Sequence, residues 1–168
     1  MSMIRFEFLD KSCPDQMLPR LFDILHTNMR SIAPTGKSYE DERQQWLAAV
    51  APALEKAPRQ IILMYAGEEL SGYFQYYVNG GTFMVEEIQI VENWQSSNLL
   101  LGLIRFLWQV LPEDVETIAA YAHKENHRSQ AIIGKLGMEQ VEESRNDDFW
   151  FYSGDFRSLA RRFGFFIT

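Results

Sequence analysis

The sequence predicts an α/β protein with a single mixed, mostly antiparallel central sheet flanked by helices. Two observations support this prediction. Some short runs alternate apolar and polar residues, as half-buried strands do, whereas others place apolar residues at helical spacing. The runs also follow one another as strand, two helices, three strands, helix, strand, helix and two strands. A length of 168 residues without a repeat or an interdomain linker predicts a single domain over residues 1–168.

The first third of the chain predicts one strand and two helices. Residues 4–10, IRFEFLD, alternate as a strand does. Residues 17–29 then carry apolar side chains at helical spacing. A second helix is predicted over residues 39–57, with Ser38 as its N-cap. We expect Pro52 to kink this helix or to end it early.

The middle of the chain predicts two hairpins and a helix. Three strand-like runs cover residues 60–66, 70–78 and 82–91, and the turns GEE and NGG separate them. The apolar run at 99–111 predicts the helix, because Pro112 follows it and would end it.

The last third predicts a strand, a helix and a final hairpin, over residues 117–123, 125–137, and 138–144 with 148–156. Gly137 is a natural C-cap for the helix. The tail at 157–168 is basic and aromatic and has no firm assignment. A surface helix that packs Phe163 and Phe165 inward is the favoured interpretation.

Composition restricts the function. The formal net charge of -7 repels nucleic acid on average and attracts a cationic amine. Cys13 is the one cysteine, which excludes a disulfide framework and fits a reducing compartment. No segment resembles a signal peptide or approaches the roughly eighteen apolar residues of a membrane span. We therefore expect a cytoplasmic protein without nucleic-acid or membrane partners, while its oligomeric state stays open, a homodimer included.

The first candidate for function is the turn NWQSSNLLLG at 93–102, which lies between a predicted strand and a predicted helix. The first N–H groups of a helix lack partners, and the helix dipole favours an anion there. Such turns usually contain glycine, because the backbone must approach the anion closely. Ser96, Ser97 and Asn98 stand here instead, and each is a good N-cap. The turn alone therefore fits simple capping better than phosphate binding.

A second segment, NHRSQAIIGKLGM at 126–138, changes this balance. Together with the order of elements, the two segments resemble the GNAT superfamily, the acyl-CoA-dependent N-acyltransferases. That family's cofactor turn reads Val-x-Pro-x-x-(Arg/Gln)-Gly-x-Gly-x-(Gly/Ala), and its second signature reads Asn-x-x-(Ala/Ser), Tyr and Gly-Phe. The positions equivalent to the turn are Ile90, Glu92, Gln95, Ser96, Asn98 and Leu100. The second signature corresponds to Asn126, Ser129, Gly137 and Met138, with Ile133 at the Tyr position.

The resemblance implies a GNAT order of elements and acetyl-CoA as the co-substrate, with transfer of its acyl group to a primary amine. Backbone groups of Ile88, Gln89 and Ile90 would hold the pantetheine arm. Pyrophosphate would bind at Gln95, Ser96, Ser97, Asn98, Leu99 and Leu100. Asn126 and Ser129 would contact the far part of the cofactor. No metal is expected, since a strand-to-helix junction separates His123 from His127.

The strand 82–91 carries the candidate general bases, Glu86 and Glu87. Alternation places Glu86 on the apolar face with Ile88 and Ile90, where burial raises a carboxyl pKa. We therefore prefer Glu86 as the base that accepts the amine proton. Glu87 is expected to be a solvated strand residue, unless a bulge exchanges the two faces.

Tyr121 is a third catalytic candidate, as an acid or a hydrogen-bond donor, although such a residue is more often a pocket wall. Ile133 replaces the family's usual acid and favours an alternative function: an inactive GNAT-like domain that binds an acyl-CoA, another ligand or a protein partner as sensor or scaffold. The paired glutamates favour an N-acetyltransferase, which we prefer. Its acceptor is not identified, but acidic residues favour a cationic small-molecule or peptide amine: Glu86, Glu87, Glu142, Glu143, Asp147 and Asp148.

Overall fold

The computed structural model describes residues 3–56, 58–95, 98–141 and 148–162. Their strands are β1 (Ile4–Phe8), β2 (Arg59–Ala66), β3 (Glu69–Asn79), β4 (Thr82–Ile90), β5 (Thr117–His123), β6 (Glu139–Gln140) and β7 (Phe149–Asp155). These strands form one sheet in the order β1-β2-β3-β4-β5-β7-β6. Neighbouring strands are antiparallel except β4 and β5, which are parallel. The predicted mixed, mostly antiparallel sheet is therefore confirmed.

The helices also follow the predicted order. They are α1 (Leu18–Met29), α2 (Tyr39–Lys56), the 3-10 turn η1 (Glu92–Trp94), α3 (Leu99–Val110), α4 (His127–Lys135) and α5 (Phe156–Arg162). Of the two effects expected of Pro52, an early end of α2 does not occur, since the helix continues to Lys56. Val50 and Leu54 on either side of Pro52 are buried, so packing holds the helix in place despite the lost N–H donor.

Two predicted helix caps are confirmed. The Ser38 hydroxyl accepts a hydrogen bond from the Asp41 N–H at 3.1 Å and so caps α2. Gly137 has a φ of +81°, and its N–H donates to the Gly134 carbonyl at the end of α4. The tail begins with α5, while Phe163 and Phe165 lie outside the described residues.

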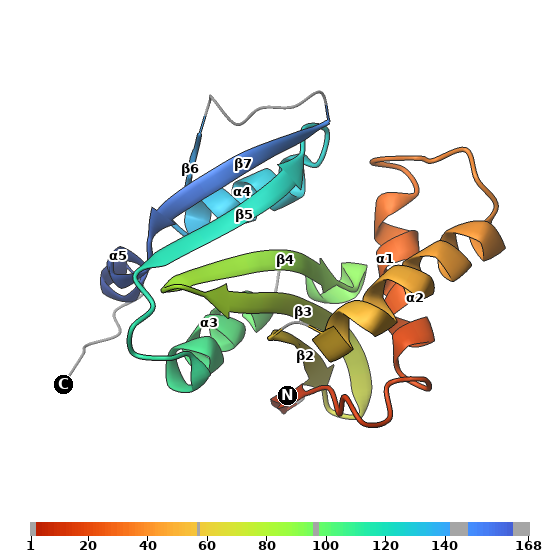
Figure 1. The fold of residues 1–168 in the computed structure, drawn as a ribbon, viewed down its shortest axis with the longest axis horizontal. Helices are drawn as coiled ribbons and strands as arrows, with labels where there is room; N and C mark the ends of the chain where they lie inside the picture. Colours follow the sequence, from red (N-terminus) through yellow and green to blue (C-terminus); the bar gives the residue numbers. More distant parts are fainter. Residues whose placement is uncertain (1–2, 57, 96–97, 142–147, 163–168) are drawn as a thin grey trace.

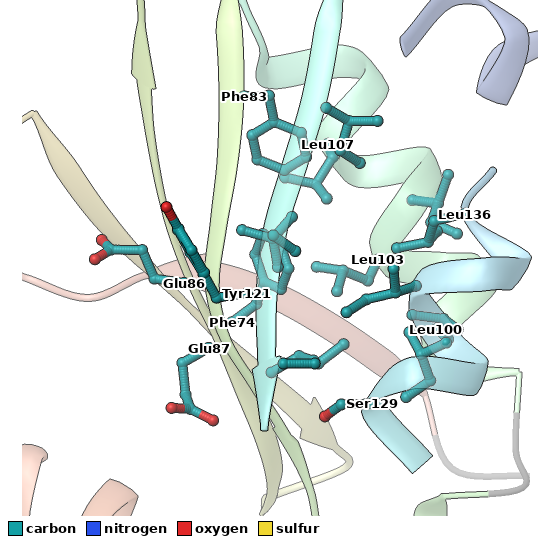
Figure 2. A pocket seen from close by; sticks show the side chains of 18 of the residues that line it. Phe74, Phe83, Glu86, Glu87, Leu100, Leu103, Leu107, Tyr121, Ser129 and Leu136 are labelled. Atoms are coloured by element: carbon teal, nitrogen blue, oxygen red, sulfur yellow. The ribbon is translucent and has the colours of Figure 1, made fainter. Parts of the chain in front are cut away.

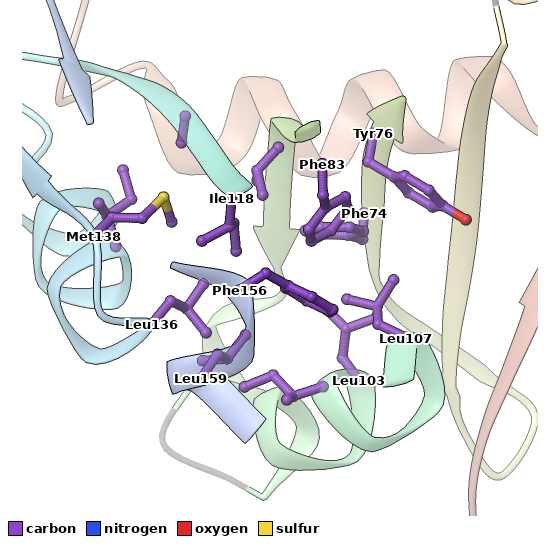
Figure 3. Packing of buried hydrophobic residues seen from close by; sticks show 14 of the residues in the cluster. Phe74, Tyr76, Phe83, Leu103, Leu107, Ile118, Leu136, Met138, Phe156 and Leu159 are labelled. Atoms are coloured by element: carbon purple, nitrogen blue, oxygen red, sulfur yellow. The ribbon is translucent and has the colours of Figure 1, made fainter. Parts of the chain in front are cut away.

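Helices cover both faces of the sheet, so two cores form (Figure 1). On one face, α1 and α2 bury Leu18, Leu21 and Leu54 against β2 and β3. On the other face, α3, α4 and α5 pack around an apolar cluster that Figure 3 shows. Its members include Phe74, Phe83, Leu103, Leu107, Ile118, Leu136, Phe156 and Leu159.

Candidate active site

A β-bulge at Glu86 opens the sheet. Parallel pairing covers only residues 82–85 of β4 and 117–120 of β5. Val85 and Glu87 face consecutive residues of β3, so Glu86 between them is an extra residue. A bulge bends its strand and increases the local twist. β4 therefore leaves β5 directly after Val85, and the two strands diverge toward α1 (Figure 1).

The bulge also moves side chains between the faces of β4. Val85 belongs to the core beneath α3, and beyond the bulge Ile88 and Ile90 pack against that same core. Glu86 and Glu87 both project away from the apolar side chains of this core (Figure 2). The prediction that Glu86 shares the face of Ile88 and Ile90, opposite Glu87, was therefore wrong. The extra residue produces the exchange of faces that alternation alone misses.

Glu86 forms an ion pair on the α2 side of the sheet. Its Oε1 accepts a hydrogen bond from Arg59 Nε at 2.6 Å and lies 3.5 Å from Gln75 Nε2. This hydrogen bond raises the pKa of Arg59, since the carboxylate favours the charged guanidinium. The Arg59 guanidinium also lies over the Tyr77 ring, 5.3 Å from its centroid. Because Arg59 already occupies the Glu86 carboxylate, Glu86 is the weaker candidate for a base.

Glu87 has the raised pKa that was predicted for Glu86. Burial raises its pKa to about 7, and the charge of Glu86 adds to the rise, while a hydrogen bond from Gln89 opposes it. Gln89 Nε2 donates to Glu87 Oε1 at 2.6 Å, and Asn28 Nδ2 donates to Gln89 Oε1 at 2.9 Å. The side chains thus form a chain from α1 to the carboxylate. Glu87 is half-buried and hydrogen-bonded to Gln89, so it is not the freely solvated strand residue that was expected.

The hydrogen bond from Gln89 gives a first prediction. In the Gln89→Leu variant the pKa of Glu87 should rise above about 7, because the donor that favours the carboxylate is lost. An NMR titration of isotopically labelled glutamate carboxyl carbons measures this pKa. The Gln75→Leu variant is the matched control, since Gln75 contacts Glu86 and not the Gln89 amide. An unchanged Glu87 pKa in Gln89→Leu would contradict the assigned contact.

Beyond the bulge, a gap separates residues 86–90 of β4 from residues 121–123 of β5, and we call this gap the split. The edge of β4 that faces the split carries backbone groups that β5 does not pair. The Val91 N–H donates to the Ser71 carbonyl at 2.9 Å, which fixes which residues of β4 hydrogen-bond to β3. Because backbone direction alternates along a strand, Gln89 faces β3, and the N–H and C=O groups of Ile88 and Ile90 point toward the split. Two of the three residues predicted to hold the pantetheine arm therefore have their backbone groups directed there.

Side chains already occupy part of this edge. The Ile90 carbonyl accepts hydrogen bonds from Gln95 Nε2 at 2.8 Å and Asn28 Nδ2 at 3.0 Å. Gln95, which was predicted to contact pyrophosphate, thus uses its amide to fix the end of β4. The groups of Ile88 lie further inside, next to the bulge.

The predicted cofactor turn is described in part. Ser96 and Ser97 lie outside the described residues. Asn98 is exposed at the N-terminus of α3 and makes no capping hydrogen bond through its side chain. Leu99 is fully buried, so it anchors the helix, and Leu100 lines a cavity beside the split. Asn98 is the described residue of the turn best placed to meet an anion.

Asn126 and Ser129 lie where β5 leads into α4. Asn126 is 8% exposed and caps α4, since its Oδ1 accepts a hydrogen bond from the Ser129 N–H at 3.1 Å. Its Nδ2 donates to the Met29 sulfur at 3.6 Å, which connects α4 to α1. Both residues line the two cavities at the split, and Asn126 also has a structural role. Ile133, at the family's Tyr position, is buried in the core.

Tyr121 lies on β5 at the mouth of the split. Its side chain is 56% exposed, contacts the Phe151 ring at 4.9 Å between centroids, and projects to the same side as Glu86 and Glu87 (Figure 2). Next to it, the His123 ring meets the Phe149 ring edge-on at 5.3 Å. An aromatic surface thus faces the two carboxylates across the mouth.

Two cavities meet at the split. The inner one has a volume of about 120 Å³ and lies between the sheet and α3, α4 and α5. The outer one, of about 160 Å³, lies between the edge of β4, α1 and α4. They share five lining residues, namely Met29, Ile88, Asn126, Ser129 and Ile132. The two cavities therefore adjoin each other along this shared wall.

Sequence reasoning missed four residues at this site. Arg128 and Lys135 are exposed cations on α4 that line the outer cavity. Asn28 holds Gln89 and Ile90 from α1, and Arg59 pairs with Glu86 from β2. A sequence signal existed only for the cations, which belong to the helix that carries the second signature.

Other predictions about the site are limited by what the structure describes. Glu142, Glu143 and Asp147 lie outside the described residues. Among the described side chains, no three His, Cys, Asp or Glu groups come together as metal ligands. No helix in the described ranges has the length and apolar character needed to cross a membrane.

Comparisons with known proteins concern the fold. No protein-family model matches the sequence, and no curated protein matches it. An acetyltransferase from Thermus thermophilus has a TM-score of 0.70 at 17% identity, over 92% of this chain and 99% of its own.

Two further solved structures are similar. The PaiA N-acetyltransferase from Thermoplasma acidophilum, in complex with coenzyme A, has a TM-score of 0.66 at 10% identity, over 91% of this chain and 99% of its own. An acetyltransferase of the GNAT family from Staphylococcus aureus has a TM-score of 0.64 at 12% identity, over 92% and 99%. These similarities show that the chain has the GNAT fold.

Proposed function

We propose that this protein transfers an acyl group from a coenzyme A thioester to the primary amine of a cationic acceptor, with Glu87 as the general base. One observation carries the proposal. A carboxyl group with a pKa of about 7 lies where β4 loses its partner strand and its backbone edge opens. A base whose pKa is near neutrality can accept an amine proton and release it again.

The residues along the split fit an acyl thioester with an anionic end. Arg128 and Lys135 supply positive charge at the outer rim, and Asn98 lies at a helix N-terminus, which favours an anion. The groups of Ile88 can bind an extended amide chain as an added strand would. When bound, the thioester supplies the activated acyl carbon. Glu87 accepts the proton that the attacking amine loses.

The mouth of the split suits a cationic acceptor. Glu87 supplies negative charge when it is ionised, and Tyr121 with Phe151 supplies aromatic surface that attracts a cation. The formal net charge of -7 attracts such a molecule from a distance. The carbon–sulfur bond of the thioester breaks as the amide forms, and Tyr121, whose hydroxyl lies at the same mouth, is our proposed proton donor to the leaving coenzyme A thiolate.

A second candidate function is binding without catalysis. It is favoured by Ile133, a buried side chain without a titratable group at the position of the family's acid. In this alternative, the protein would hold the same thioester between β4 and β5 without transferring its acyl group. The two candidates therefore differ in turnover and not in affinity for the thioester.

Isothermal titration with acetyl-CoA tests the binding that both candidates require. The parent protein should bind, and Arg128→Glu and Asn98→Asp should each raise Kd about tenfold, because a charge change near an anion costs on the order of 1 kcal/mol or more. Arg105→Glu is the matched control, since Arg105 is an exposed cation on α3 that lines neither cavity. Equal affinity of all variants would remove the assigned position of the phosphates. Absence of binding by the parent would refute both candidates.

A further inference from the structure

The inner cavity continues past the two carboxylates into the core. Its mouth carries the polar residues Glu87, Tyr121 and Ser129. Its deep end is lined by aliphatic and aromatic side chains from α3, α4 and α5, among them Leu103 and Phe156 (Figures 2 and 3). The chemical character therefore changes from polar to apolar along the cavity.

Small side chains on β5 leave this space open. Ala120 and Ala122 belong to the core on the α3 side, where they are 1% and 4% exposed. Both line the cavity, and so do Val85 and Ile88 of β4 on the other side of the split. A longer side chain at either alanine would enter the cavity. The cavity therefore exists because the side chains at these two positions of β5 are small.

An unfilled apolar cavity in a core costs stability in proportion to its volume. An apolar ligand that enters it recovers contacts and removes its own surface from water. Ile88 and Ser129 line both this cavity and the outer one, so the inner cavity lies directly beside the position proposed for the thioester. No charged side chain lines its deep end, which excludes a polar chain there.

We infer that the acyl group carried by the thioester is an aliphatic chain of about four to six carbons, rather than acetyl, and that the inner cavity receives it. The inference rests on the proposed function and names the substrate class of the same site. An apolar cavity of about 150 Å³ holds benzene, with six carbons, so about 120 Å³ fits up to about five carbons beyond the carbonyl, as in a hexanoyl group. An acetyl methyl group would leave most of this volume empty.

Affinities of a series of acyl-CoA esters test the inference without any need for turnover. Titrations with coenzyme A, acetyl-CoA, butanoyl-CoA, hexanoyl-CoA and decanoyl-CoA give one Kd each. Butanoyl-CoA should bind about fifteenfold more tightly than acetyl-CoA, because each methylene that leaves water contributes about fourfold, or ~0.8 kcal/mol. Beyond hexanoyl-CoA the gain should stop or reverse, since the cavity is full. Thermal shifts at equal ligand concentration should follow the same order.

Filling the cavity from the protein side should remove the dependence on chain length. In Ala120→Leu, and independently in Ile104→Phe from α3, the ratio of the acetyl-CoA Kd to the hexanoyl-CoA Kd should fall toward one. Leu107→Met keeps the side-chain volume and is the matched control, which should retain the ratio of the parent. Two filling variants are used because overpacking can unfold one of them.

The outcomes separate this inference from the function on which it rests. If coenzyme A binds and all esters have the same Kd, the proposed function stands and the assignment of the cavity falls. If longer chains bind progressively more weakly, the cavity is closed to them, and the inference is likewise overturned. If coenzyme A and its esters all fail to bind, both the function and the inference are refuted.

Discussion

Replacing Glu87 by Gln is expected to lower kcat for acyl transfer by about 10²–10⁴-fold, the usual contribution of general base catalysis. Gln keeps the shape of the side chain and cannot accept the amine proton. The Michaelis constant for the acyl-CoA should change little, since Glu87 acts on the amine. In the parent, the rate should fall on the acid side with a midpoint near pH 7, where Glu87 takes up a proton. That acid limb should be absent from the residual activity of the variant.

Glu86→Gln is the matched control, because it removes the adjacent carboxylate. Its kcat should remain within about tenfold of the parent, since Arg59 neutralises Glu86 and leaves it no role as a base. If Glu86→Gln is instead the damaging change, the base is Glu86, and the preference for Glu87 that follows from the bulge is wrong. If both variants keep full activity, neither carboxylate is the base, and Tyr121→Phe becomes the next variant. A parent that binds acyl-CoA and transfers nothing supports the non-catalytic function.

Much of the fold could be predicted from the sequence because its signals are local. The NGG turn, the helix stop at Pro112 and the C-cap at Gly137 each mark an element boundary through conformations that few residues adopt. Pro52 shows the limit of such signals. Its ring disfavours a helix locally, but burial of Val50 and Leu54 contributes more, and α2 continues.

The faces of β4 could have been assigned from the sequence with closer attention to spacing. Apolar residues stand at 83–85 and again at Ile88 and Ile90, so the interval from Val85 to Ile88 is three residues where strict alternation requires two. That interval marks the bulge at Glu86. A prediction based on continued alternation places Glu86 on the apolar face, whereas in the structure neither carboxylate lies there.

Other features of the site could not be predicted because they depend on contacts between distant parts of the chain. Asn28 and Gln89 are separated by 61 residues, and Arg59 and Glu86 by 27. No periodicity links such pairs, and only the packing of α1 and β2 on the sheet brings them together. The pKa of Glu87 depends on this packing, since burial is the main cause of its rise.

The second large effect expected of Glu87 is on stability, and it depends on pH. The pKa of Glu87 is about 7 in the folded protein and is expected to return to its ordinary value of 4.5 on unfolding. Between these two values the folded state binds more protons than the unfolded state, so the free energy of unfolding falls as pH rises. Above pH 7 the ionised carboxylate costs the folded protein up to about 3 kcal/mol, and below pH 4.5 it costs nothing.

Glu87→Gln removes this cost, since the amide is neutral at every pH. Urea unfolding should therefore give similar free energies for the variant and the parent near pH 4.5, and a variant more stable by up to about 3 kcal/mol at about pH 8. Glu86→Gln is the control. At about pH 8 its free energy of unfolding should be lower than that of the parent, because the substitution breaks the ion pair with Arg59. A gap between Glu87→Gln and the parent that stays constant across this pH range would show that the pKa of Glu87 is not raised. The same carboxylate would then lack the property that makes it the proposed base.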